Sequence, residues 1–320
     1  MSIGVLVIGL GQIGMASDLN LAHDKFVYTH ARAFEQHPSF TLLGGVDACH
    51  DRCAEFSSRY HRPAFSNVSE GMVVCRPAVV VIAVPTEAHA DVLQEVLRVG
   101  APRAVLCEKP LSYDYFVAQR MVESCQKFNC QLFVNYVRRA DPAVLEIKSR
   151  LEVGQINTPA KGVVWYSKGL FHNGSHFFDL MQYWLGAMQS FSLLQIGRRW
   201  GDDPEPDVAI VFGSSLVYFI AAYEENYSHY TAELVFPSGR LRYDLGGERV
   251  IWQPAVVSEQ LQDYKVLDSN EHQLANALDR IQWHVANQLA AALTGSPASL
   301  CNGQEALSTI KCLTSIKNAL

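Results

Sequence analysis

Two short stretches of the sequence carry side chains that can move a proton near neutral pH. His176 and Asp179 are three residues apart beside an apolar stripe, so on a helix they share one face. A carboxylate one turn away can fix the tautomer of an imidazole and raise its basicity, which suits a general acid or base. Lys109 is the second candidate, because it stands at the end of a predicted buried strand. The alternatives are a core histidine with satisfied hydrogen bonds and a lysine that is only a solvated surface charge.

A third stretch, at the N-terminus, has the residues of a phosphate-binding loop. Residues 3–8 are apolar, uncharged and rich in β-branched side chains, which predicts a short central strand. Gly9, Gly11 and Gly14 follow at once. In such a loop the first glycine permits a tight turn, the second lets the backbone approach a pyrophosphate, and the third lets the next helix lie close to the strand. The stretch predicts dinucleotide binding, and a merely structural turn is the alternative.

Asp47 is the candidate for binding the adenosine ribose of a dinucleotide. It ends the predicted strand 40–46, and its carboxylate can accept hydrogen bonds from both ribose hydroxyls. Because the same charge would repel a 2′-phosphate, the sequence favours NAD over NADP as the cofactor, although Arg52 is close enough in sequence to weaken that preference. An ordinary strand-end or helix-capping aspartate is the alternative.

Residues 17–28 are predicted to be an insertion. The ribose-binding acid usually follows the glycine loop by about 20 residues, whereas Asp47 comes 33 positions after Gly14. A helical pattern resumes at residues 30–34 and stops before Pro38. The insertion either forms part of the rim or lid of the active site or is a decorative surface loop.

Strand and helix patterns alternate through the first 135 residues. Further strands are predicted at residues 78–84, 103–107 and 131–134, with a helix to about residue 100 and another at 112–128. Ligands of such a sheet bind beyond the carboxyl ends of its strands. The residues after these strands should therefore border the site that the glycine loop opens, and they are Val84, Pro85, Thr86, His89, Glu108 and Lys109.

Beyond residue 135 the order of the predicted elements changes. A helix at 142–151 comes first, the helix 173–186 carries His176 and Asp179, and helices at 271–292 and 304–317 end the chain. Strand-like segments bounded by turn residues lie at 162–167, 191–197, 208–212, 216–222, 231–236 and 240–245.

We therefore predict an α/β protein of two domains. Residues 1–135 form an N-terminal Rossmann dinucleotide-binding domain, and residues 136–320 form an α/β domain for substrate binding and oligomerisation, with a large, mostly antiparallel open sheet. One face of that sheet can serve as a subunit interface. The C-terminal helix can pack back on the first domain.

The composition excludes several other classes of protein. Of the 320 residues 49% are apolar and 18% are charged, which argues against a disordered chain. A formal net charge of −6 leaves no basic stripe for a nucleic acid or an anionic membrane surface, and no apolar run reaches the roughly 18 residues of a membrane span. The cysteines lack the paired spacing of a zinc site, so we expect reduced thiols, no metal and a cytoplasmic location.

Together these motifs resemble those of the Gfo/Idh/MocA oxidoreductases, a family named for glucose-fructose oxidoreductase and inositol dehydrogenase. The resemblance implies a nicotinamide-binding domain, a second α/β domain with an open sheet, and homodimers or homotetramers packed through that sheet. Members usually oxidise or reduce a hydroxyl-bearing carbon of a sugar, cyclitol or nucleotide-linked sugar. The stretches that carry the resemblance are, in order, Gly9 to Gly14, Asp47, Val84-Pro85-Thr86 with His89, Glu108-Lys109-Pro110 and His176-Phe177-Phe178-Asp179.

The resemblance also implies roles for single residues. His176 would be the acid/base, Lys109 a catalytic lysine that orients the reacting hydroxyl, and Asp179 the carboxylate beside the histidine. Many members have an acidic residue four positions before the histidine, where this chain has His172. The residues expected to contact the substrate are Tyr136, Arg139, His172, Asn173 and His176. Those expected to contact NAD are Gly9, Gly11, Gln12, Ile13, Gly14, Asp47, Val84, Pro85, Thr86, His89, Glu108 and Lys109.

Two alternatives to a simple dehydrogenase stay open at this point. An enzyme of this kind can keep and recycle a tightly bound NAD, and the same fold can serve as a non-catalytic nicotinamide sensor. The presence of both Lys109 and His176 favours an enzyme, because a sensor has no need of a base matched to a lysine.

Overall fold

The computed structural model describes residues 2–261 and 263–320 of the chain. The contacts within it define two compact units, and each is described by itself. Unit 1 combines the chain up to Ala140 with Asp279–Lys311, and unit 2 combines Asp141–Leu278 with Cys312–Leu320. The chain therefore leaves unit 1, builds most of unit 2 and then returns.

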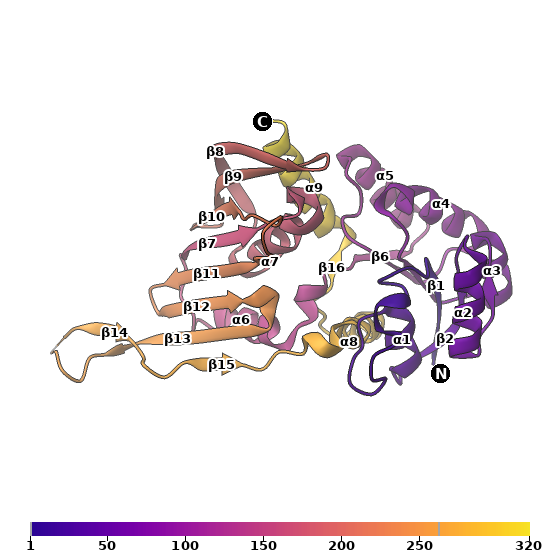
Figure 1. The fold of residues 1–320 in the computed structure, drawn as a ribbon, viewed down its shortest axis with the longest axis horizontal. Coiled ribbons are helices and arrows are strands. Elements are labelled where there is room, and N and C mark those ends of the chain that lie inside the picture. The colour runs from indigo at the N-terminus through magenta and orange to yellow at the C-terminus, as the bar shows by residue number, and fades with distance from the viewer. Residues whose placement is uncertain (1, 262) are drawn as a thin grey trace. The chain divides into compact units, whose positions relative to one another are not determined.

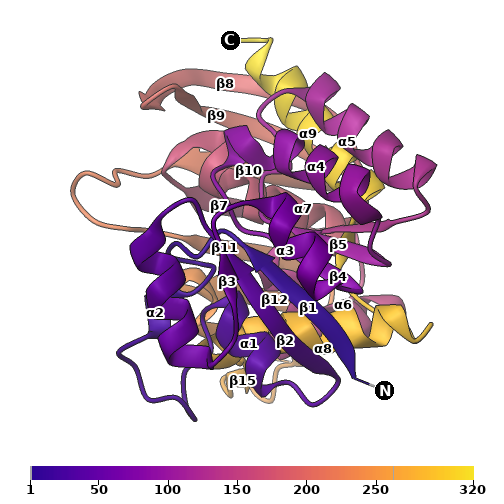
Figure 2. The ribbon, with the colours of Figure 1, turned by 90° about the vertical axis from the view of Figure 1, so that its right-hand side faces the viewer.

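Unit 1 is organised around a parallel sheet, which Figures 1 and 2 show from two sides. Within the described residues the sheet has seven strands in the order β16-β6-β5-β4-β1-β2-β3. All neighbours are parallel except β16 and β6. Without β16 this is the strand order of a dinucleotide-binding Rossmann fold. The strands are β1 (Ile3–Ile8), β2 (Phe40–Val46), β3 (Ala64–Phe65), β4 (Val79–Ile82), β5 (Ala104–Cys107), β6 (Gln131–Val134) and β16 (Cys301–Asn302).

Helices bury both faces of this sheet. Side chains alternate along β1, so Val5 and Val7 belong to the apolar layer of α1 and α8, whereas Leu6 and Ile8 belong to the layer of α3, α4 and α5. These four side chains are almost completely buried, which explains why the strand is one uninterrupted apolar run. The helices are α1 (His30–Gln36), α2 (His50–Tyr60), α3 (Val68–Cys75), α4 (His89–Gly100), α5 (Tyr115–Lys127), α8 (Ile281–Leu293) and the first part of α9 (Gly303–Lys317).

Unit 2 is organised around a mostly antiparallel sheet. Its nine strands within the described residues follow the order β14-β13-β12-β11-β7-β10-β9-β8, with β15 beside β13. Only β7 and β10 pair in parallel. The predicted fold class is thereby confirmed. The strands are β7 (Lys161–Tyr166), β8 (Met188–Trp200), β9 (Asp203–Phe212), β10 (Ser215–Ala221), β11 (Thr231–Phe236), β12 (Gly239–Asp244), β13 (Arg249–Val257), β14 (Lys265–Leu267) and β15 (His272–Leu274).

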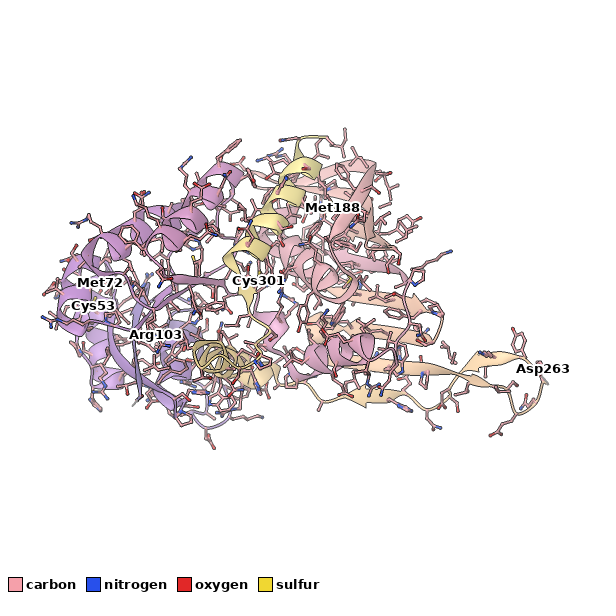
Figure 3. All side chains as sticks on the ribbon, turned by 180° about the vertical axis from the view of Figure 1, so that it is seen from behind. Cys53, Met72, Arg103, Met188, Asp263 and Cys301 are labelled. Carbon is pink, nitrogen blue, oxygen red and sulfur yellow. The ribbon has the colours of Figure 1, made fainter. Side chains whose placement is uncertain are left out.

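One face of this second sheet is covered and the other is open. The helices α6 (Pro142–Glu152) and α7 (Ser175–Leu185) and the end of α9 pack on the covered face. On the open face, Trp165, Tyr218 and Val235 remain between 37% and 51% exposed. The strands β13 and β14 form a hairpin that carries Asp263 at its tip, as Figure 3 shows.

Some predicted boundaries in unit 2 are wrong. The predicted helix 271–292 starts too early, because residues 272–274 pair with β13 and α8 begins only at Ile281. The predicted strand 191–197 is the middle of the longer β8. The predicted helix 173–186 begins at Ser175, after the π-helical turn Gly169–Gly174. In each case a partner that is distant in sequence, or the geometry of a turn, decides the boundary.

The described residues include no helix that is both long enough and apolar enough to cross a membrane. Their cysteines are free thiols. The same residues hold no group of three or more histidine, cysteine, aspartate and glutamate side chains that could bind a metal.

The predicted insertion is an excursion between the glycine loop and α1. Met15 N donates to Gly11 O at 2.9 Å, so a first helical turn starts at the loop, and it ends in the 3-10 turn Ala16–Asp18. The helix α1 begins only at His30, whose amide donates to Ile13 O at 3.0 Å. The main chain therefore resumes beside the loop that it left.

A buried ion pair closes this excursion. Asp18 and Arg32 are both fully buried, with 3.3 Å between Arg32 Nε and Asp18 Oδ1. Asp18 also accepts hydrogen bonds from Tyr28 N at 2.7 Å, Thr29 N at 2.9 Å and Thr29 Oγ1 at 2.9 Å. Thr29 is the N-cap of α1. Both ends of the excursion are thus held in the core, while residues 20–25 are exposed.

Replacing Arg32 by leucine should destabilise the protein by about 3–5 kcal/mol, because the substitution leaves the Asp18 carboxylate buried without its countercharge. The free energy of unfolding in urea measures this effect. Arg62 is exposed, so Arg62→Leu is a matched control and should change the stability by less than about 0.5 kcal/mol. Equal stabilities of the two variants would contradict a structural role for the pair.

Candidate functional site

The glycine loop has the shape that a dinucleotide requires. Gly9 has a φ of +95°, and a Cβ there would lie 2.5 Å from the carbonyl of Ala83. A Cβ on Gly14 would collide with the carbonyl of Gly9. Gly11 differs, because a Cβ there would meet nothing nearer than Arg52 Nη1 at 3.8 Å. The loop is therefore tight inside and open beside Gly11, where a pyrophosphate can approach the main chain at the start of a helical turn.

The two other predicted loop residues hold the chain that follows. Gln12 Oε1 accepts a hydrogen bond from Ser17 Oγ at 3.2 Å, and Ile13 O accepts the His30 amide. Gln12 itself is exposed.

Asp47 lies beside the glycine loop, at the end of β2. Its Oδ2 accepts a hydrogen bond from Leu10 N at 2.8 Å, and its Oδ1 accepts one from Cys49 N at 2.8 Å. Arg52 Nη1 is 3.5 Å from the same Oδ2, and the Arg52 side chain is 52% exposed. Oδ2 thus accepts from two donors, whereas Oδ1 has room for a second hydrogen bond, which a hydroxyl of an adenosine ribose can donate.

His89 ties together the turns after β4 and β5. Its Nε2 lies 3.0 Å from Val84 O and its Nδ1 lies 3.3 Å from Leu111 O. Burial lowers the pKa of His89, and the two carbonyl contacts oppose that shift. Pro85 precedes the 3-10 turn Thr86–Ala88, which leads into α4. The predicted residues Val84, Pro85 and Thr86 thus lie at the carboxyl edge of the sheet.

Glu108 stands at the same edge, at the end of β5. Its Oε1 accepts hydrogen bonds from His30 Nε2 at 2.8 Å and from Asn135 Nδ2 at 2.7 Å. Burial alone would raise the pKa of Glu108, but these hydrogen bonds and the charges of His30 and Lys109 hold it below its usual range. The carboxylate is therefore charged, next in sequence to Lys109. Neither His30 nor Asn135 was among the predicted site residues.

Two of the predicted substrate residues are buried in unit 1. Tyr136 is 3% exposed and follows β6. Arg139 is also 3% exposed, and its Nη1 donates to Glu305 Oε1 on α9 at 3.1 Å. The guanidinium charge of Arg139 is thus balanced by Glu305, and its predicted contact with the substrate stays a prediction.

In unit 2, His176 and Asp179 lie on α7 as predicted. They are 9% and 1% exposed, and their three-residue spacing puts both on one face of the helix. The π-helical turn before α7 carries His172, which is exposed, and Asn173, which is half-buried. The predicted residues of this stretch therefore form one short segment of unit 2.

Carboxylates from β9 hold this segment in place. Asp203 accepts hydrogen bonds from Phe171 N at 3.0 Å and His172 N at 2.8 Å, and Glu205 Oε1 accepts one from Gly169 N at 3.0 Å. Arg198 Nε donates to Glu205 Oε2 at 2.7 Å. Burial raises the pKa of Asp203 although main-chain amides donate to it. These residues were missed, because they are about 30 positions away from the turn and no local pattern marks them.

The structure thus assembles the predicted residues in two groups. The first lies along the carboxyl ends of β1, β2, β4, β5 and β6 in unit 1, and the second lies on α7 and the turn before it in unit 2. The first group can bind an anion and ribose hydroxyls. The second can exchange a proton.

Sequence comparison agrees with the first of these groups. Residues 3–136 match the profile of an oxidoreductase family, GFO_IDH_MocA, whose description is a NAD-binding Rossmann fold. The inositol 2-dehydrogenase of Rhizobium meliloti is 27% identical over 146 residues, which are 40% of this chain and 44% of that protein. The match therefore spans less than half the length of this relative.

Solved structures share the fold of the whole chain. An NAD binding oxidoreductase from Klebsiella pneumoniae superposes with a TM-score of 0.79 at 15% identity, covering 99% of this chain and 96% of that one. The WlbA dehydrogenase from Bordetella pertussis, in complex with NADH and UDP-GlcNAcA, has a TM-score of 0.74 at 18% identity and covers 99% and 96%.

The family match and the glycine loop fall on the same residues, and the shared fold extends over both units. Residues 3–136 therefore form an NAD(P)-binding Rossmann domain that matches the oxidoreductase family GFO_IDH_MocA.

Proposed function

We propose that this protein is an NAD-dependent oxidoreductase that transfers a hydride between a nicotinamide and a hydroxyl-bearing carbon of a sugar, a cyclitol or a nucleotide-linked sugar. The observation that carries the proposal is the buried pair His176 and Asp179 on one face of α7, in a chain that also has a dinucleotide-binding loop. The names of the relatives support the substrate class, since one is an inositol 2-dehydrogenase and another holds UDP-GlcNAcA.

The chemistry of the side chains suits this reaction. When bound, the nicotinamide takes up or returns the hydride. In the oxidation direction the substrate hydroxyl loses a proton, and the imidazole of His176 accepts it. Asp179, one turn away, orients that imidazole. The ammonium group of Lys109 orients the hydroxyl and stabilises the negative charge that develops on its oxygen.

The proposed division of labour follows the predicted domains. Residues 1–135 bind the cofactor, and residues 136–320 bind the substrate, with Tyr136, Arg139, His172 and Asn173 as its further contacts. The cofactor is NAD, because the Asp47 carboxylate beside the glycine loop accepts ribose hydroxyls and repels a 2′-phosphate.

The protein also forms a homodimer or homotetramer through the open face of its second sheet. This face exposes Trp165, Tyr218 and Val235 around a groove of about 520 Å³. Apolar side chains of this size, gathered on one surface, are typical of a protein interface.

His176→Ala should lower kcat by about 10²–10⁴-fold, because the variant has no proton acceptor at the reacting oxygen. Lys109→Ala should also depress turnover, and each change should lower turnover far more than it lowers the affinity for the dinucleotide. The absorbance of reduced nicotinamide, followed over a panel of free sugars, inositols, sugar acids and nucleotide-linked sugars, measures turnover. His272→Ala and Lys127→Ala, at exposed positions, are the matched controls.

Unchanged turnover in both site variants would rule out these two roles. A different outcome is that the wild-type protein binds NAD and yet forms no reduced nicotinamide with any substrate of the panel. That result would point to a recycled cofactor or a sensor. Analysis of products formed without added NAD separates these two, because only a recycling enzyme would form product.

Asp47→Asn should lower the preference for NAD over NADP by at least about tenfold, because the negative charge that repels the 2′-phosphate is lost. Titration of each dinucleotide against the protein gives the ratio of the two dissociation constants. Asp51, exposed at the start of α2, provides the control Asp51→Asn. An unchanged ratio in Asp47→Asn would remove this basis for the preference.

Val235→Asp should dissociate the oligomer, because it places a charge in the centre of the proposed apolar interface. Sedimentation velocity over a range of protein concentrations measures the change in mass. Val73 of α3 is 60% exposed and Val235 is 51% exposed, so Val73→Asp is a matched control. A monomeric wild-type protein, or a Val235→Asp variant with the wild-type mass, would contradict the interface.

A further inference from the structure

The carboxylate of Glu108 is held asymmetrically at the carboxyl edge of the parallel sheet. Both strong hydrogen bonds, from His30 Nε2 at 2.8 Å and Asn135 Nδ2 at 2.7 Å, go to Oε1. The other oxygen, Oε2, accepts a longer hydrogen bond of 3.4 Å from Lys109 N. A carboxylate oxygen can accept two hydrogen bonds. Oε2 therefore has the capacity to accept a strong bond from a bound molecule.

The two donors are themselves fixed. His30 is 1% exposed and Asn135 is 2% exposed. Asn135 Nδ2 also lies 3.3 Å from Gln282 Oε1 on α8. Glu108 keeps 14% of its side chain exposed, so the carboxylate is reachable while its two donors are not. The direction of Oε2 is thus set by groups in the core.

His30 reaches this position because of the excursion at residues 17–28. The helix α1 starts at His30, and the N-cap Thr29 is bound to the buried Asp18. The His30 amide donates to Ile13 O in the glycine loop, while its side chain contacts Glu108. One residue therefore connects the phosphate loop to the turn that carries Lys109.

We propose that His30 is a positioning residue for the nicotinamide half of the cofactor. It holds Glu108 Oε1, so that Oε2 accepts a hydrogen bond from a hydroxyl of the ribose that bears the nicotinamide. The proposal rests on the proposed cofactor site at this edge of the sheet. It gives the excursion a role in binding that a decorative surface loop would not have.

The test compares His30→Leu with His30→Gln in the full-length protein. Leucine cannot donate to Glu108, whereas the glutamine amide can. His30→Leu should weaken the binding of NADH about tenfold, which is the effect expected from the loss of one hydrogen bond to a charged group. His30→Gln should restore the affinity to within about threefold of the wild type. His23, which is exposed in the same excursion, provides the control His23→Leu.

A second ligand separates positioning from a general structural effect. ADP has the adenosine and the pyrophosphate but lacks the nicotinamide ribose, so its affinity should be the same in His30→Leu and in the wild type. Fluorescence titrations with NADH and ADP measure both affinities without any substrate. The proposal would be overturned if His30→Leu weakened the binding of NADH and ADP equally, or if it left the binding of NADH unchanged.

These outcomes can be told apart from a failure of the proposed function. A selective loss of NADH affinity in a protein that oxidises none of the sugars would leave the role of His30 standing and remove the proposed reaction. If the wild-type protein turns over sugars but His30→Leu leaves the NADH affinity unchanged, the proposed reaction would stand and the role of His30 would be removed. A wild-type protein that binds no dinucleotide would overturn both.

Discussion

The nucleotide edge of unit 1 depends on one buried charge. Asp18 has lost its contact with water, so its carboxylate is stable only because Arg32, two main-chain amides and a hydroxyl surround it. Its partners are the residues that restart the interrupted helix. The position of α1, and through it that of His30, follows from the satisfaction of this carboxylate. An insertion in a loop has in this way become part of the core.

The parallel sheet brings the other residues of this edge together. Strands that run in one direction end at one edge, so residues that follow different strands meet without being near in sequence. Asp47, Val84, Glu108 and Asn135 follow β2, β4, β5 and β6 in this way. The second sheet has no such edge, and the predicted proton-transfer residues His176 and Asp179 lie on the helix α7 instead. There the carboxylates of Asp203 and Glu205 fix the turn that leads into α7.

The parts of the fold that could be predicted are those with a local pattern. The central strands of unit 1 are apolar on both faces, so their sequence marks them. The strand β13 contains Arg249, Gln253 and Pro254 and lacks that pattern. The site shows the same division. Gly9, Asp47 and His176 belong to recognisable motifs. The contact of His30 with Glu108 joins residues 78 positions apart, and no local sequence pattern around either residue indicates it.

The return of the chain to unit 1 has a consequence for synthesis on the ribosome. The helix α8 supplies Val285, Ala286 and Leu289 to the apolar layer that covers one face of the parallel sheet. All the strands of that sheet except β16 have been made by residue 134. At typical rates of translation the covering helix follows the last of these strands by about 10–30 s. A nascent Rossmann domain therefore exposes, for that interval, the part of this sheet face that α8 covers, and this face is complete only after α8 has been made.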